Sequence, residues 1–94
     1  MESKVYKAPQ RIDRNSSEEV QEFLDALVDS GITDLVVDMS DMQYISSAGL
    51  RVLVATQKRL MNGGKFALKN VPAFVKETLD LTGLSAMIPI LKEE

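Results

Sequence analysis

The stretch from Asp34 to Leu53 joins an apolar run to a segment of helical periodicity through a polar turn. The run, Leu35-Val36-Val37, is apolar on both faces, which is typical of a covered strand in a parallel sheet. The polar turn occupies residues 38–43. After it, apolar residues recur at helical spacing, namely Leu50, Leu53 and Val54. The sequence therefore predicts a strand, a short loop and a helix, in that order.

Adjacent serines, Ser46 and Ser47, stand at the predicted start of this helix and are followed by Ala48 and Gly49. The first N–H groups of a helix have no partner within it, and together with the helix dipole they favour negative charge. We therefore expect any specific chemistry at this point. The alternative is that a serine only caps the helix, with its oxygen accepting a hydrogen bond from a backbone N–H. Both can hold, because one serine can cap while the other stays exposed.

The chain before this stretch predicts an edge strand and a helix. Lys4 to Ala8 alternates weakly and stops at a proline, which indicates a short strand at a sheet edge, with a second extended piece near Ile12. Ser16, followed three residues later by Glu19, fits a capping box at a helix start, and Gly31 ends that helix. Its apolar stripe, predicted to face the core, comprises Val20, Phe23, Leu24, Leu27 and Val28.

The central strand is predicted over about 34–39 and the second helix over about 47–61, with an end at Asn62-Gly63-Gly64. The residues of this helix that are predicted to face the core are Leu50, Leu53, Val54, Leu60 and Met61. A third strand follows at 65–69. The side chains on one face of that strand are Phe66 and Leu68.

The last part of the chain predicts a helix and a short strand. Pro72 lies in the first turn of the helix, where its missing N–H costs nothing, and Gly83 ends the helix. The buried side of the helix is predicted to comprise Phe74, Val75 and Leu79. Met87 to Leu91 is predicted as a last strand, which Pro89 places at an edge or ends. Lys92-Glu93-Glu94 is expected to be a solvated tail.

Strands and helices thus alternate with short connections, which predicts one α/β domain over residues 1–94 with a largely parallel sheet. The absence of cysteine excludes disulfides and thiolate sites, and the absence of histidine removes the commonest general base and metal ligand. A net charge of -3 argues against a nucleic-acid partner. No apolar stretch has the length of a membrane span or a signal core. We expect a cytoplasmic protein without a cofactor.

A set of acidic residues, Asp34, Asp38 and Asp41, surrounds the predicted central strand and its end. Paired carboxylates at the carboxyl ends of parallel strands can bind a divalent cation. Solvated loop acids and Asx turns are the simpler interpretation, and we expect no metal site.

A basic set on the second helix forms its predicted exposed face, together with the neighbouring Val52. The residues are Arg51, Val52, Ala55, Lys58 and Arg59. This face is either a partner surface or a solvated surface. Arg51 lies one helical turn after Ser47, so it can reach an anion bound there.

The segment from Tyr44 to Leu53, Tyr-Ile-Ser-Ser-Ala-Gly-Leu-Arg-Val-Leu, preceded by Asp38-Met-Ser40, resembles the signature of STAS domains, specifically of bacterial anti-sigma factor antagonists. Further pieces agree: they resemble the family's glycine turn into its next strand (63–68), its third helix (75–84) and its following strand (87–90). The resemblance covers roughly Ser16 to Leu91. It implies a sheet of about four to five mostly parallel or mixed strands packed with about three helices.

The resemblance also implies a partner-switching protein without catalysis. An unphosphorylated antagonist binds an anti-sigma factor that is also a serine kinase, and this frees a sigma factor. Phosphorylation ends the association and a phosphatase restores it. By the matching motif the phosphorylated residue is Ser47, two before Gly49, with Ser46 as the second choice because the family most often has Asp there. Asp38 and Ser40 would orient the loop. The implied partner-binding residues are Gln43, Tyr44, Ser46, Ser47, Ala48, Gly49, Leu50 and Arg51.

Both ends of the chain depart from this family. The family usually begins with a fuller pair of strands than fits before Ser16, and a final helix often follows its last strand. Weak self-association is one way to supply the missing surface. The alternative function is a constitutive STAS subunit of a lipid-transport or stress-sensing complex, in which Ser47 only caps the helix. An enzyme is the least favoured hypothesis, because no general base is visible near the serines.

Overall fold

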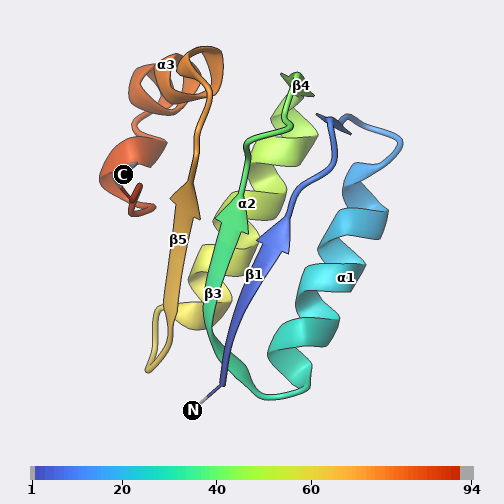
Figure 1. Cartoon of the computed structure of the whole chain (residues 1–94), viewed down its shortest axis with the longest axis vertical. Helices are drawn as coiled ribbons and strands as arrows, with labels where there is room; N and C mark the ends of the chain where they lie inside the picture. Colours follow the sequence, from blue (N-terminus) through green and yellow to red (C-terminus); the bar gives the residue numbers. More distant parts are fainter. Residues whose placement is uncertain (1, 92–94) are drawn as a thin grey trace.

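The structure, a computed structural model, describes residues 2–91 and has strands and helices that alternate along the chain (Figure 1). In chain order the elements are β1 (Glu2–Lys7), β2 (Arg11–Ile12), α1 (Ser17–Asp29), β3 (Ile32–Asp38), β4 (Tyr44–Ile45), α2 (Ser47–Leu60), β5 (Lys65–Lys69), α3 (Ala73–Thr82) and the short 3-10 helix η1 (Leu84–Ala86). The main sheet has the order β1-β3-β5, and β2 pairs with β4 in a small second sheet. Every one of these pairings is parallel, so the predicted fold class is confirmed.

The two faces of the main sheet differ. Leu35 and Val37 of β3 and Phe66 and Leu68 of β5 are buried, because α1 and α2 pack on this face. Val36 points to the other face and is only partly buried. The apolar run of β3 therefore does not mark a strand covered on both faces, and that prediction is wrong within residues 2–91. β1 is an edge strand, as predicted, although it runs from 2 to 7 instead of 4 to 8.

Three aromatic or sulfur-containing side chains that were predicted to be buried are exposed. Phe23 is 49% exposed, because it lies over the edge strand β1, where its ring contacts the ring of Tyr6 at a centroid distance of 5.2 Å. Phe74 is 44% exposed, because the ten-residue helix α3 buries only the narrow side that carries Val75 and Leu79. Met61 is 61% exposed, because it lies just after the last turn of α2.

The buried side of α2 is rotated relative to the prediction. Val52, which was predicted to be exposed, is only 4% exposed, whereas Leu50 and Val54 are half-buried. The cause is that α2 packs against α1 as well as against the sheet. Its buried residues are Gly49, Val52, Leu53, Thr56 and Leu60.

The start of α1 is not a capping box. The Ser16 side chain accepts a hydrogen bond from the Asp13 N–H instead of one from the helix, at 3.0 Å. The Asp13 carboxylate accepts from the N–H groups of Asn15 and Ser16, each at 3.0 Å. A turn that begins at Asp13 therefore starts the helix, and Glu19 is exposed.

The predicted last strand is reduced to one bridge. Residues 84–86 form η1, and only Ile90 pairs with β5, in parallel, opposite Leu68. Pro89 precedes this bridge and offers only its carbonyl, which accepts from the Leu68 N–H at 2.9 Å. The edge position predicted for this proline is confirmed. The predicted tail, 92–94, lies outside the described residues.

Candidate functional site

Two buried methionines anchor the loop between β3 and α2 to the hydrophobic core. Met39 and Met42 are 0% and 4% exposed, and the Met42 N–H donates to the Met39 carbonyl at 3.0 Å. The Gln43 N–H then donates to the Gln10 carbonyl at 2.7 Å, which ties the loop to the segment before β2. Buried apolar anchors and backbone hydrogen bonds together restrict the loop to one path, so the start of α2 has a defined position.

The small β2–β4 sheet lies directly before the start of α2. Arg11 pairs with Tyr44 in its register, and the Arg11 guanidinium lies 4.6 Å from the centre of the Tyr44 ring. Tyr44 is 43% exposed, so this cation–π contact shapes a surface and not a core. The sequence analysis missed Arg11. Its only signal was its place in the extended piece around Ile12, thirty or more residues away from the motif.

The two serines of the motif have different roles in the structure. The Ser46 side chain accepts a hydrogen bond from the Gly49 N–H at 3.2 Å, and Ser46 is the N-cap of α2 with an extended backbone. Its own N–H donates to the Ile12 carbonyl at 2.9 Å. Ser47 is the first residue of the helix and is exposed. Among residues 2–91 its hydroxyl makes no hydrogen bond. Ser46 therefore caps, and Ser47 presents a free hydroxyl at the positive end of a 14-residue helix.

Gly49 allows α2 to approach β2 and β4 closely. A Cβ atom at this position would lie 2.6 Å from Ile45 Cγ1 and 3.0 Å from both Cγ2 and the carbonyl oxygen of Ile12. The carbonyl is backbone and cannot move aside without disturbing β2. The glycine of the motif is thus required by packing, and it fixes how far the helix start projects from the small sheet.

Asp38 closes the end of β3. Its carboxylate accepts hydrogen bonds from the Ser40 N–H at 3.0 Å and from the Asn70 side-chain amide at 3.1 Å. The Ser40 N–H is the main reason why the pKa of Asp38 lies below its usual value. Asn70 has a φ of 54°, in the left-handed region that Asn tolerates better than most residues. The sequence analysis missed Asn70, whose role depends on a contact 32 residues away.

The acidic set does not come together. Asp34 pairs in register with Lys65 near the start of β5, whereas Asp38 lies at the opposite end of β3. The Asp41 carboxylate forms an exposed ion pair with Lys7 at 3.5 Å. Across the described part of the chain, no group of three or more such side chains is placed to hold a metal ion.

A shallow apolar groove runs beside the helix start. It has a volume of about 330 Å³ and lies between α2 and η1. Its lining residues are Leu50, Arg51, Val54, Ala55, Lys58 and Leu84. The half-buried side chains of Leu50 and Val54 form its apolar part, while the exposed Arg51 and Lys58 add positive charge. We call this surface the α2 groove.

The predicted basic face is divided by the fold. Arg59 is not part of the α2 groove, because its guanidinium binds Asp29 at 2.7 Å and Asp25 at 3.3 Å on α1. The hydrogen bonds to Asp29 and Asp25 raise the pKa of Arg59. Arg51 also borders a second cleft of about 360 Å³ between α1 and α2, next to Glu18 and Glu22. Of the predicted basic face, Arg51 and Lys58 therefore line the α2 groove.

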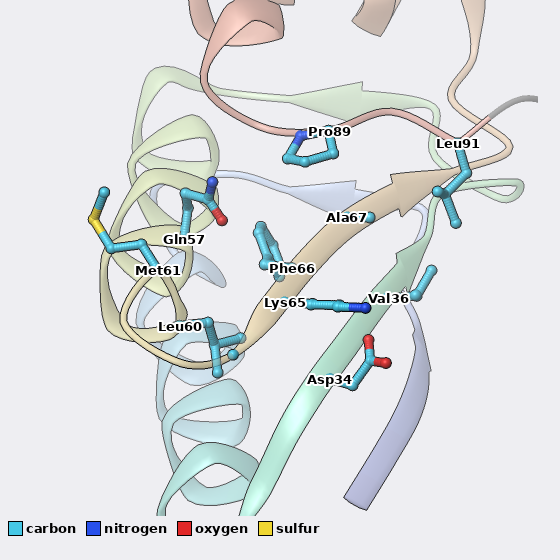
Figure 2. Close-up of a pocket in the computed structure, with 11 residues that line it drawn as sticks. Asp34, Val36, Gln57, Leu60, Met61, Lys65, Phe66, Ala67, Pro89 and Leu91 are labelled. Atoms are coloured by element: carbon cyan, nitrogen blue, oxygen red, sulfur yellow. The ribbon is translucent and has the colours of Figure 1, made fainter. Parts of the chain in front are cut away.

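A deeper apolar cleft lies at the other end of α2 (Figure 2). It has a volume of about 450 Å³ and is lined mainly by the end of α2, the first half of β5 and the segment around Pro89. None of the residues implied by the motif lines it. The site built around Ser47 and this cleft are thus separate features at opposite ends of one helix.

No helix among residues 2–91 is long and apolar enough to cross a membrane.

Comparison with known protein sequences gives one family. The family model described as STAS domain matches residues 2–94. The chain is 35% identical over 80 residues to the anti-sigma-B factor antagonist of Bacillus subtilis, across 84% of this chain and 72% of that protein. It is 33% identical over 76 residues to BtrV of Bordetella bronchiseptica, which is named as a candidate anti-sigma factor antagonist. That alignment covers 80% of this chain and 66% of BtrV, slightly less than two thirds of its length.

Solved structures agree with the fold. The chain is similar to the crystal structure of an anti-sigma factor antagonist from Mycobacterium paratuberculosis, with a TM-score of 0.88 and 24% identity. The match covers 97% of this chain and 78% of that one. At this identity the similarity concerns the arrangement of helices and strands.

Proposed function

Because the chain belongs to the STAS domain family, we propose that it is an anti-sigma factor antagonist that works by partner switching. In this proposal the unphosphorylated protein binds an anti-sigma factor, which is also a serine kinase, and so frees a sigma factor. The kinase phosphorylates Ser47 and ends the association, and a phosphatase restores it. The protein has no catalysis of its own. The names of its relatives support the class, and the geometry around Ser47 supports the switch.

The observation that carries the proposal is the division of roles between the two serines. Ser46 is held by two hydrogen bonds, one through its side chain and one through its N–H. Ser47 is exposed at the first helical position and its hydroxyl is free among residues 2–91. A kinase must reach the hydroxyl that it modifies, so the exposed Ser47 fits this requirement better than Ser46, which is half-buried and caps the helix. In the alternative function Ser47 only caps the helix, and the position of Ser46 at the N-cap supports the switch over this alternative.

A phosphate on Ser47 should leave the fold intact. It adds about -1.5 to -2 charges at pH 7. At a helix N-terminus each negative charge is favourable by about 0.3–1 kcal/mol. The exposed Arg51 lies one turn further on and can form a charge-assisted contact with the phosphate. The helix N-terminus and Arg51 should therefore stabilise the phosphate, and the domain should stay folded.

The same phosphate should disrupt a bound partner. Ser47 lies one turn before the α2 groove, whose Leu50 and Val54 offer apolar contact area. A partner that packs there covers Ser47 and must then desolvate a doubly charged group or oppose it with like charge. This cost is several kcal/mol, which exceeds the favourable interaction between the phosphate and the helix N-terminus. Binding is therefore lost while the free protein stays folded.

Phosphosite mapping tests the proposal directly. The protein is incubated with the cognate kinase and ATP, and fragmentation mass spectrometry locates the phosphate. We expect phosphate on Ser47 in the natural protein and in Ser46→Ala, and none in Ser47→Ala. Phosphate on Ser46 alone would move the switch by one residue. Phosphate on neither serine would favour the constitutive STAS subunit.

A charge reversal tests where the partner binds. Arg51→Glu should weaken binding of the anti-sigma factor and leave the melting temperature nearly unchanged, because Arg51 is exposed and no ion pair of it occurs among the described residues. Lys4→Glu, an exposed reversal on β1, is the matched control and should bind normally. If Lys4→Glu abolishes binding and Arg51→Glu does not, the partner surface is elsewhere.

A further inference from the structure

The second edge of β5 is only half paired. At its end, the Leu68 N–H donates to Pro89 at 2.9 Å and the Leu91 N–H donates to the Leu68 carbonyl at 2.8 Å. Alternate residues of a strand direct their backbone groups to opposite sides. Phe66, two residues before Leu68, therefore directs its N–H and carbonyl to the same edge as Leu68. No strand among residues 2–91 pairs with Phe66 there.

The unpaired edge at Phe66 lies in the apolar cleft of about 450 Å³ (Figure 2). Side chains line it on both sides of the strand: Leu60 and Met61 come from the end of α2, and Val36 and Ala67 lie on the open face of the sheet. Met61 is 61% exposed and Leu91 is 44% exposed. A backbone donor and acceptor are thus flanked by apolar side chains, of which Met61 and Leu91 are exposed and Val36 and Ala67 are half-buried.

We propose that this cleft binds a short, extended, apolar peptide segment of a partner protein, which adds to the first half of β5. A peptide supplies a backbone donor and acceptor for Phe66, and its alternate side chains reach both sides of the strand. The cleft carries Asp34 and Lys65, which are opposite in charge and adjacent in register. Their charges balance, so a neutral segment fits better than a charged one. The three residues Lys65 to Ala67 span about 10 Å, which sets the length of the segment to about three residues.

The described end of the chain, up to Leu91, does not pair with β5 at Phe66. Ile90 pairs in parallel with Leu68, two residues beyond Phe66, and its neighbours Pro89 and Leu91 contribute to the lining of the cleft. The proposal is also independent of the phosphorylation switch. The cleft lies at the end of α2, and the 14-residue helix places it about 21 Å from Ser47.

A titration followed by nuclear magnetic resonance tests the proposal on the isotope-labelled full chain. The probe is the capped tripeptide N-acetyl-Val-Leu-Val-amide. We expect a saturable shift of the Phe66 amide signal and of its neighbours in β5. The same peptide with an N-methyl group on leucine lacks the central donor and should bind about tenfold more weakly.

Matched variants place the binding. Met61→Lys puts a charge at the apolar wall and should weaken the tripeptide at least about tenfold. Leu81→Lys changes a side chain that is 80% exposed on α3 and should bind like the natural protein. Ser47→Asp should also bind the tripeptide normally, so a failure of the switch and a failure of this proposal are distinguishable.

Three results of the peptide titrations would overturn the proposal. They are the absence of saturation up to the solubility limit, equal binding of the N-methylated peptide, and shifts that map away from β5. A shift of the Phe66 amide with protein concentration alone, without peptide, would assign the cleft to a second copy of the chain and would also overturn it.

Discussion

Both α1 and α2 begin at a Ser-Ser pair, yet the two pairs behave differently. In α1, Ser16 accepts from the N–H of Asp13, and the Ser17 hydroxyl donates to the Arg14 carbonyl at 3.3 Å. In α2, Ser46 accepts from a helix N–H and Ser47 is left exposed. The same dipeptide thus serves a turn in one helix and a cap with a free neighbour in the other. What precedes the pair decides: an aspartate that organises a turn before α1, and the strand β4 before α2.

The largest effect should come from charge at Ser47. Ser47→Asp, or the phosphorylated protein, should bind the anti-sigma factor roughly a thousandfold more weakly, which corresponds to about 4 kcal/mol. The reason is the cost of covering a charge at a packed interface. Isothermal titration calorimetry measures the affinity. Ser17→Asp, at the equivalent place in α1, is the control and should bind within a few fold of the natural protein. Equal losses in both variants would end the distinction between the two pairs.

The next effect should come from the close approach that only α2 makes. Gly49→Ala forces a Cβ atom against Ile45 and the Ile12 backbone, so we expect a loss of about 1–3 kcal/mol in the free energy of unfolding. Glu19 holds the equivalent place in α1 and is exposed. Glu19→Ala should therefore change stability by less than about 0.5 kcal/mol. Urea unfolding compares the two variants, and an unchanged midpoint for Gly49→Ala would show that the helix start can shift freely.

A smaller effect should separate the two serines of α2. Ser46→Ala removes the hydrogen bond to the Gly49 N–H and should cost about 0.5–2 kcal/mol. Ser47→Ala removes an exposed hydroxyl and should change stability by less than about 0.5 kcal/mol. The same urea experiment measures both. The reverse order of stabilities would mean that Ser47 is the cap in solution.

The main features of the fold could be predicted from the sequence, because apolar periodicity is clear in a helix or strand that packs against a single other element. The sequence analysis predicted the α/β order, the parallel pairing and the position of the Ser46-Ser47 motif. It misplaced Phe23 and Val52. The apolar periodicity of a helix shows which residues share one side, but it does not show where that helix lies relative to a sheet edge or to a second helix. The sequence analysis also missed Arg11, which meets Tyr44 only after both segments have folded.

The candidate site could be predicted from the sequence less completely than the fold. That one serine could cap while the other stayed free followed from the chemistry of helix starts. Which serine does so depends on where β4 ends, and the sequence does not mark that boundary. The failed capping box at Ser16 has the same origin, since Ser-x-x-Glu is a local pattern and the competing Asp13 lies outside it.

The smallest effect should appear in the acid dependence of stability at the approaches to the two helices. Asp13 before α1 and Asp38 before α2 both have pKa values below their usual range, held there chiefly by the backbone N–H groups of Ser16 and Ser40. A carboxyl whose pKa is lower in the folded than in the unfolded state stabilises the fold fully above its unfolded pKa of about 3.9. This stabilisation is lost as the pH falls through the lowered folded value.

Asp38→Asn and Asp13→Asn keep an oxygen that can accept the same hydrogen bonds but cannot titrate. Each variant should therefore unfold at a slightly lower urea midpoint than the natural protein at pH 7, because the charge-assisted part of the hydrogen bonds is lost, and with a shallower fall of the midpoint below pH about 4. The loss should not vanish, because Asp80 also has a lowered pKa, owing first to its hydrogen bond with Ser85. Since both aspartates are solvent-accessible, neither variant should shift the curve far. A steeper fall in Asp38→Asn than in the natural protein would contradict the hydrogen bonds from Ser40 and Asn70, and with them the fixed path of the chain into α2.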